Sequence, residues 1–236
     1  MRVRQLGYAF VAAFASPAVG AEAPVTLSVD LGVVSDYRFR GVSFSDRDPA
    51  IQGEVSADHE SGGHAGLWAS TISETSGGAN LELDLEGGWL FELSPLLSVD
   101  VSAIYYVYPG DSAANYVEPV LTAFYKVGPA TTRFGVAYIP KQGATRDATG
   151  RKRDNKYAFL GIELPIKATP LTFDSQIGYE RGAFDFSTRG GKWDWQLSLS
   201  AEVKKITLGL SYVDGAVRGE ADETEPTVVG SVLFGF

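Results

Sequence analysis

The stretch WDWQLSLSAEV, residues 193–203, decides the fold class of this chain. Its apolar residues are Trp193, Trp195, Leu197, Leu199, Ala201 and Val203, and they alternate with Asp194, Gln196, Ser198, Ser200 and Glu202. Successive side chains of a β-strand point to opposite faces, so this period of two predicts a strand with one apolar and one polar face. A helix would scatter the same apolar residues around its circumference.

The same alternation recurs from one end of the chain to the other. Segments of this kind cover residues 24–34, 50–59, 64–73, 80–92, 96–108, 116–127, 131–140, 156–165, 170–181, 192–203, 205–213 and 226–236. Most have the roughly 9 to 11 residues that a tilted strand needs to cross a bilayer. We therefore predict an all-β fold, an antiparallel transmembrane β-barrel of about 12 strands, with ten or fourteen strands as the alternatives.

The connections between these segments alternate in length. Long ones cover 35–49, 74–79, 109–115, 141–155, 182–191 and 214–225, while the short ones include Ser94-Pro95, Gly128-Pro129-Ala130 and Lys204. Long loops on one side and tight turns on the other are typical of an outer-membrane barrel with both termini in the periplasm. A soluble β-sandwich has no reason to sort its loops in this way.

Aromatic residues are expected to gather at the two membrane interfaces. The predicted outer strand ends contain Tyr105, Tyr108, Tyr116, Tyr138, Tyr157, Tyr179, Trp193, Trp195 and Tyr212, and the inner ends contain Trp89, Phe91, Tyr125, Phe234 and Phe236. This distribution predicts two aromatic girdles, whereas an aromatic-rich soluble core would not favour strand ends.

The two ends of the chain carry the signals of export and insertion. Residues 1–21 combine Arg2 and Arg4 with a short apolar run and a small-residue cleavage site, with cleavage after Ala23 as the alternative, so we predict a signal peptide followed by a barrel over 22–236. The terminal Phe236 resembles the signal read by the outer-membrane insertion machinery. We therefore expect the protein in the bacterial outer membrane, in contact with its lipids.

Composition excludes several classes of protein. The chain has no cysteine, so an exported form must be stable without disulfides. It has 20 basic and 29 acidic residues, a formal charge of −9, which disfavours nucleic-acid binding. No window of 18 apolar residues follows the predicted signal peptide, which is expected of a barrel whose strands alternate.

Residues 34–70 carry a resemblance to a known family. It rests on Ser35-Asp36-Tyr37-Arg38, Arg40-Gly41, the residues from Ser43 to Asp46, and Pro49-Ala50-Ile51-Gln52-Gly53. This stretch resembles the opening of the TorF-like porins of proteobacteria, the Gcw_chp group. The resemblance implies an outer-membrane location and a pore, and it brings no catalytic or ligand site.

Acidic residues dominate the predicted interior of the barrel. The candidate pore-lining residues are Asp30, Glu54, Glu82, Asp84, Glu86, Asp100, Glu118, Lys126, Arg133, Asp174, Asp194 and Glu202, in which Lys126 and Arg133 are the clear cations. A water-filled lumen of this kind has a negative potential and favours cations. In the alternative, the carboxylates pair with loop cations or one another and plug the narrow barrel.

Two charged loops are expected at the outer mouth. The basic loop contains Lys141, Arg146, Arg151, Lys152 and Arg153, which could hold lipopolysaccharide phosphates, attract an anionic solute, fold inward against the acidic wall, or simply remain solvated. The acidic loop contains Glu220, Asp222, Glu223 and Glu225, which could bind divalent cations, although their spacing defines no coordination sphere.

The sequence offers no catalytic, cofactor or metal site. His59 and His64 are its two histidines, and they flank a predicted periplasmic turn with no recognisable metal spacing. We therefore predict a porin for passive, weakly cation-preferring diffusion of small hydrophilic solutes. The alternatives are a closed structural or adhesive barrel that binds lipopolysaccharide or a surface partner and, less favoured, an outer-membrane hydrolase that uses a histidine.

Overall fold

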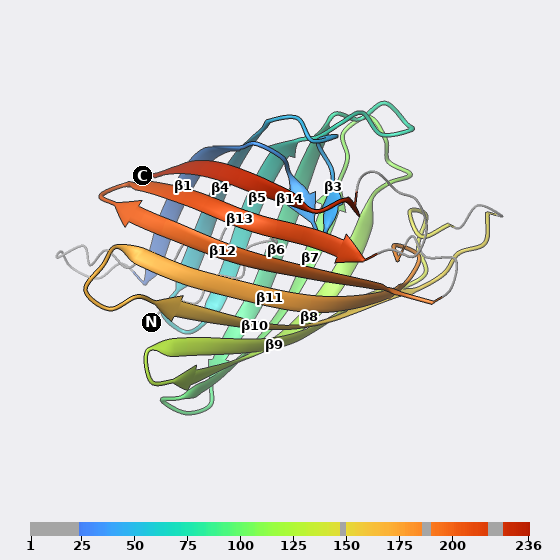
Figure 1. Cartoon of the computed structure of the whole chain (residues 1–236). Helices are drawn as coiled ribbons and strands as arrows, with labels where there is room; N and C mark the ends of the chain where they lie inside the picture. The colour runs from blue at the N-terminus through green and yellow to red at the C-terminus, as the bar shows by residue number, and fades with distance from the viewer. Residues whose placement is uncertain (1–23, 147–149, 186–189, 217–223) are drawn as a thin grey trace.

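The computed structural model describes residues 24–146, 150–185, 190–216 and 224–236. Twelve of its strands form one closed antiparallel barrel (Figure 1). They are β1 (Val25–Val34), β4 (Ala50–His59), β5 (Gly63–Thr71), β6 (Leu81–Glu92), β7 (Leu97–Val107), β8 (Tyr116–Val127), β9 (Ala130–Ile139), β10 (Asn155–Pro165), β11 (Leu171–Gly182), β12 (Lys192–Val203), β13 (Ile206–Ala216) and β14 (Thr227–Gly235). The two remaining strands, β2 (Arg38–Phe39) and β3 (Val42–Ser43), pair only with each other.

The predicted barrel of 12 strands is confirmed, and the alternatives of ten and fourteen are wrong. Every barrel strand begins and ends within three residues of its predicted bounds. The reason is visible in β12, where Trp193, Leu197 and Leu199 are exposed on the outer face while Lys192 and Asp194 are buried inside. Because apolar residues must face outward and polar residues inward, the alternation determines both where a strand lies in the sequence and which of its side chains point into the barrel.

The last strand closes the barrel against the first. β14 pairs with β1 from Asp30 opposite Gly235 to Val34 opposite Ser231. The backbone N–H of Phe236 extends this ladder by donating to the carbonyl of Val29 at 2.9 Å. Closure leaves no unpaired sheet edge, which is the condition for a sheet to cross lipid.

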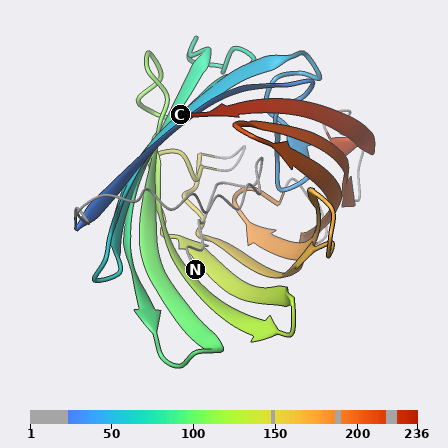
Figure 2. The ribbon, with the colours of Figure 1, turned by 90° about the vertical axis from the view of Figure 1, so that its left-hand side faces the viewer.

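The two ends of the barrel differ as the sequence predicts. Short turns at 60–62, 93–96, 128–129, 166–170 and 204–205 lie at the same end as the C-terminus, and the long connections lie at the other end (Figure 1). Figure 2 shows the strands as a ring seen from the side of the short turns. Among the described residues no helix is long and apolar enough to cross a membrane. The predicted signal peptide lies outside the described residues.

The barrel is apolar outside and polar inside. At its outward positions every barrel strand exposes large apolar side chains, for example Leu27, Ile51, Leu121, Leu160 and Leu210. Inward positions carry Gln52, Glu82, Thr122, Asp174 and Thr207, all of them buried. This arrangement reverses that of a water-soluble protein and is typical of a barrel surrounded by lipid.

Exposed aromatic residues gather at both ends of the barrel, but three tyrosines predicted for the outer girdle do not belong to it. At the end with long loops Tyr105, Tyr138, Trp193 and Tyr212 are exposed, and Tyr179 and Trp195 are half-buried on the same outer face. At the other end Trp89, Phe91, Tyr125, Phe234 and Phe236 are all exposed. The assignment of Tyr108, Tyr116 and Tyr157 to the outer girdle is wrong, because their side chains are buried inside the barrel. Proximity to a strand end does not decide facing; the phase of the alternation does.

A packed cluster fills the interior near the long loops. Its buried members are Val34, Tyr37, Phe39, Ala50, Ala79, Tyr106, Tyr108, Tyr116, Ile139, Val213 and Val229. Tyr37 and Phe39 belong to the connection between β1 and β4, residues 35–49. This connection was expected as an outer loop, but its first half folds into the barrel, because it carries enough apolar and ionic side chains to pack against the inner wall.

Candidate functional site

The inward segment is a tight hairpin built from β2 and β3. Arg38 pairs with Ser43 and Phe39 with Val42, leaving Arg40 and Gly41 as the two turn residues. Both have positive φ, 49° and 81°, as the commonest two-residue hairpin turn requires. A Cβ on Gly41 would lie 2.9 Å from Cα of Gly215 on β13, so only glycine allows the turn to approach the wall this closely.

Arg40 holds the hairpin to the opposite wall of the barrel. Its Nη2 donates to Glu118 of β8 at 2.7 Å, and its Nη1 donates to Glu180 of β11 at 2.8 Å. The guanidinium also stacks on the ring of Tyr157, 4.1 Å from the centroid. Lys192 completes the network with a 2.8 Å ion pair to Glu180. All four charged side chains are at most 2% exposed, so two buried cations neutralise two buried carboxylates.

Further contacts fix the base of the hairpin. Nε of Arg38 donates to Asp36 at 2.5 Å, and its Nη1 donates to the carbonyl of Glu225, which precedes β14, at 3.0 Å. Asp36 accepts a 2.6 Å hydrogen bond from the hydroxyl of Ser43. Burial, with the nearby carboxylates of Glu82 and Asp84, raises the pKa of Tyr37 well above its ordinary range, so this phenol stays protonated. The hairpin is therefore tied to the wall at its tip and at its base.

The predicted pore-lining residues lie on the inner face of the barrel. The alternation of burial along each strand places Asp30, Glu54, Glu82, Asp84, Glu86, Asp100, Glu118, Arg133, Asp174 and Asp194 inward. Lys126 and Glu202 share this facing near the short-turn end, where Glu202 is exposed and Lys126 donates to the carbonyl of Pro95 at 3.4 Å.

These carboxylates divide between two walls that differ in their partners. We call one the acidic wall. It lies on the neighbouring strands β1, β4, β5, β6 and β7, and all of these strands but β5 contribute carboxylates to it. These carboxylates are Asp30, Glu54, Asp58, Glu82, Asp84, Glu86 and Asp100. Within it, His64 contacts Asp100 at 2.7 Å. Each of Asp58, Glu82, Asp84, Glu86 and Asp100 has one buried oxygen that no described residue hydrogen-bonds.

We call the other side the paired wall; it consists of Glu118, Asp174, Glu180 and Asp194 on β8, β11 and β12. Arg40 and Lys192 hold Glu118 and Glu180, and Arg133 forms a bidentate pair with Asp174 at 2.5 and 2.9 Å. Asp194 accepts a hydrogen bond from the hydroxyl of Tyr157 at 2.9 Å. Buried carboxylate oxygens of the described lumen without a hydrogen-bond partner therefore lie mainly on the acidic wall; on the paired wall only Oδ2 of Asp194 is of this kind.

Three interior cations were not predicted from the sequence. Lys126 and Arg133 are not the main basic groups of the lumen, because Arg38, Arg40 and Lys192 are all buried within it. Lys192 could have been found, since it shares the inward phase of Asp194 and Gln196. Arg38 and Arg40 lie outside the alternating strands, so no local pattern predicts which way their side chains point. Arg40, for example, is held inside the barrel by Glu118 and Glu180, which are 78 and 140 residues away in sequence.

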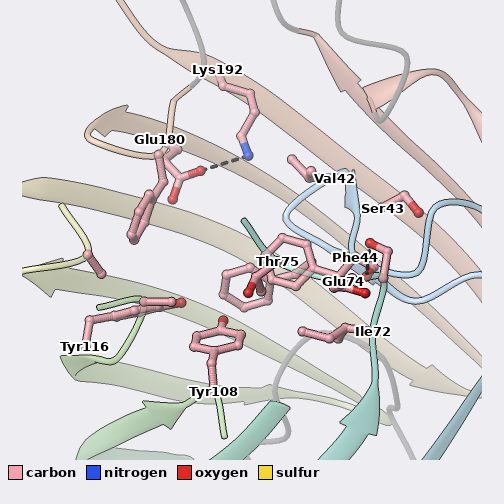
Figure 3. A pocket seen from close by; sticks show the side chains of 15 residues that line it. Val42, Ser43, Phe44, Ile72, Glu74, Thr75, Tyr108, Tyr116, Glu180 and Lys192 are labelled. Carbon is pink, nitrogen blue, oxygen red and sulfur yellow. Dashed lines mark hydrogen bonds and ion pairs between the residues drawn. The ribbon is translucent and has the colours of Figure 1, made fainter. Parts of the chain in front are cut away.

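A cavity of about 290 Å³ opens between the hairpin and the long loops (Figure 3). Phe39, Val42 and Phe44 of the inward segment form part of its lining, and Tyr108, Tyr116 and Phe184 form another part. The Glu180–Lys192 ion pair lies along the same cavity (Figure 3). No pattern in the sequence predicts this cavity, because its lining comes from connections that are far apart in the chain.

The basic loop keeps its cations at the surface. Lys141, Arg146, Arg151, Lys152 and Arg153 are all exposed. A bridge between Arg146 and Lys152 and a 2.8 Å hydrogen bond from the N–H of Arg153 to the carbonyl of Thr145 join the two described sides of this loop. Its described part does not fold against the acidic wall. Of the four carboxylates named for the acidic loop, only Glu225 is described, and it contacts Arg47 at 3.1 Å; Glu220, Asp222 and Glu223 lie outside the described residues.

The two histidines lie near the short-turn end, as predicted. Nδ1 of His59 and the hydroxyl of Ser61 are 2.7 Å apart within the exposed turn. His64 faces inward, where its Nε2 meets Asp100. Within the part of the chain that the structure describes, no group of three or more His, Cys, Asp or Glu side chains is arranged to hold a metal ion.

Two solved structures named as porins have a similar fold at low sequence identity. A structure named as the NanC porin matches with a TM-score of 0.62 and 13% identity, over 89% of this chain and 98% of that one. One named as the KdgM porin matches with a TM-score of 0.60 and 9% identity, again over 89% and 98%. At such identities the likeness shows a shared fold, that of an outer-membrane barrel.

Sequence comparison gives the family. No curated protein sequence matches this chain. A family model described as "Bacterial protein of unknown function (Gcw_chp)" matches residues 18–231, which include the hairpin, both walls and all the strands but the end of the last. The chain belongs to the Gcw_chp family.

Proposed function

We propose that this protein is a bacterial outer-membrane porin for passive, weakly cation-preferring diffusion of small hydrophilic solutes, without a catalytic step. The observation that carries the proposal is the unequal pairing of the interior carboxylates. Arg40 of the hairpin and Lys192 of β12 neutralise Glu118 and Glu180. Five carboxylates of the acidic wall each have a buried oxygen without a hydrogen-bond partner among the described residues, whereas on the paired wall only Asp194 has one. An excess of negative charge along one side of a water-filled lumen attracts cations and repels anions.

In this proposal the inward hairpin narrows the lumen and the acidic wall sets its charge preference. The pore-lining residues are then those of the two walls together with Lys126, Arg133 and Glu202 near the short turns. The resemblance of residues 34–70 to TorF-like porins agrees with this assignment, and so does the porin fold of the structural matches.

The envelope partners belong to the same proposal. The export signal predicted at residues 1–21, the apolar outer face and the girdles support an outer-membrane location with the long loops outside the cell. The exposed cations of the basic loop would contact lipopolysaccharide phosphates, and the insertion machinery would read Phe236.

Reconstitution in planar bilayers tests the proposed function. In a KCl gradient we expect channels whose reversal potential has the sign of modest cation selectivity. Replacing two acidic-wall residues, as Asp84→Asn with Glu86→Gln, should move this potential toward that of a non-selective pore, whereas Glu60→Gln in the exposed turn should not. Absence of channels above background, or a preference for anions in the unmodified protein, would overturn the proposal.

The hairpin itself favours a second candidate, a closed structural barrel. Its tip is tied across the interior by buried ion pairs, which is the arrangement expected of a plug as well as of a constriction. Channels that are absent in the unmodified protein and present in Arg40→Ala would identify the closed barrel. The plug would then be this hairpin, and the basic loop between β9 and β10 would remain the contact to lipopolysaccharide or to a surface partner.

A further inference from the structure

The cavity above the hairpin has a lining suited to one class of ligand. A chain of aromatic contacts runs from Phe44 through Phe39, Tyr106 and Tyr116 to Phe184, with ring centroids 4.3 to 6.0 Å apart. Four of these five rings, and that of Tyr108, line the cavity. Aromatic faces carry a negative electrostatic potential, so several rings around one space favour a cation with an apolar body.

The charged residues at the cavity also favour a cationic ligand. Lys192 is the one cation among the described lining residues; it is 1% exposed and forms an ion pair with Glu180, so its charge is neutralised within the wall. Glu74 lies in the lining with an exposed side chain, and its neighbour Thr75 donates a 2.9 Å hydrogen bond to the carboxylate of Asp111. Ala144 is the one described residue of the basic loop that lines the cavity. Within the described lining, the exposed charged side chain is therefore the carboxylate of Glu74.

We propose that this cavity binds small organic cations, namely ammonium groups carried on an apolar ring or a compact alkyl body. Its volume of about 290 Å³ lies at the lower end of ligand-binding pockets, which sets the size at about one ring with its substituents. The aromatic arc contacts the body and the cationic group, and Glu74 attracts the charge. As a capture site at the outer mouth it rests on the proposed porin function, but binding itself does not require conduction.

Equilibrium binding to the refolded protein in detergent micelles tests the site separately from transport. The probe is benzyltrimethylammonium, with benzyl alcohol as the neutral and benzoate as the anionic ligand of the same ring. Calorimetry should show the cation bound about tenfold more tightly than the alcohol, and benzoate bound most weakly. Equal affinities, tightest binding of benzoate, or no binding of the cation would overturn the proposal, whether or not the protein forms channels.

Variants locate the site. Phe184→Leu keeps an apolar side chain and removes a ring, so the affinity for benzyltrimethylammonium should fall about three- to tenfold. Phe44→Leu should act similarly, and Phe91→Leu on the outer face is the matched control with no expected change. Glu74→Gln should reduce the affinity for the cation while leaving that for benzyl alcohol unaltered. Unchanged cation binding in both ring variants would show that the probe binds elsewhere.

Discussion

Arg40 shows how one residue of a loop can organise the interior of a barrel. Its backbone adopts a conformation that non-glycine residues rarely take, with φ of 49°. Two carboxylates and a tyrosine ring hold its side chain, and none of them is near it in sequence. Such a backbone persists where the surrounding structure over-determines it, and it commonly marks a functional site.

Replacing Arg40 should release the hairpin. Arg40→Ala leaves Glu118 and Glu180 short of a cation inside the barrel, and removing one partner of a buried ion pair typically costs about 3 to 5 kcal/mol. We expect the amides of residues 36–45 to exchange with solvent much faster, while the amides of β8 and β11 keep their protection. Hydrogen exchange followed by mass spectrometry measures both.

Arg47→Ala is the matched control for this prediction. Arg47 belongs to the same connection, and its ion pair with Glu225 is exposed, with side chains 43% and 62% accessible. Exposed ion pairs of this kind contribute about 0 to 1 kcal/mol to stability, so the amides of the hairpin should exchange in Arg47→Ala at nearly the rate of the unmodified protein. Equal protection of the hairpin in Arg40→Ala and in the unmodified protein would contradict the role given to Arg40.

At the scale of the element, each barrel strand is specified by its two environments. Leu199 of β12 is exposed between Phe173 of β11 and Leu210 of β13, and Asp194 of the same strand is buried inside. A one-residue slip would exchange these positions and turn a carboxylate toward lipid. The pattern thus fixes the register more firmly than β-propensity alone would.

An arginine on the outer face should lower the free energy of unfolding by an amount that depends on its depth in the membrane. Leu199 lies between the two girdles, so Leu199→Arg should destabilise the barrel by about 2 to 4 kcal/mol. Val203→Arg, at the short-turn end of the same strand, should cost about 0 to 1 kcal/mol, because the arginine reaches the interface there. Urea unfolding in lipid vesicles measures the difference, and equal costs would place this face of β12 outside the membrane.

The same elements show what sequence could predict and what it could not. Strand bounds and facing follow from local alternation, so the twelve strands and the inward acidic residues were accessible from sequence. The hairpin was not, because Arg40-Gly41 is an unusual pair for such a turn and its ion-pair partners lie on β8 and β11. The cavity was inaccessible for the same reason, since five separate stretches of chain surround it.

At the scale of the whole molecule, the closed sheet and the interior charge have separate origins. Backbone pairing from β1 around to β14 closes the barrel whatever its interior contains. The hairpin and the two walls then set the charge of the space that closure creates. Variants of the interior should therefore alter conduction with the barrel intact, and changes at the closing seam should act on assembly.

Phe236 tests this separation. Its backbone bonds Val29, but its ring is 68% exposed, so Phe236→Ala keeps the seam and removes only an exposed side chain. We expect refolding into detergent to be nearly unchanged, because little packing is lost. In a Gram-negative host the assembled fraction should instead fall several-fold, as judged by heat-modifiable migration of membrane fractions. Phe234→Ala, which removes another exposed ring of β14, is the control and should assemble more completely. Equal defects in both variants, or a refolding defect in Phe236→Ala alone, would assign Phe236 to the stability of the barrel and not to its recognition during insertion.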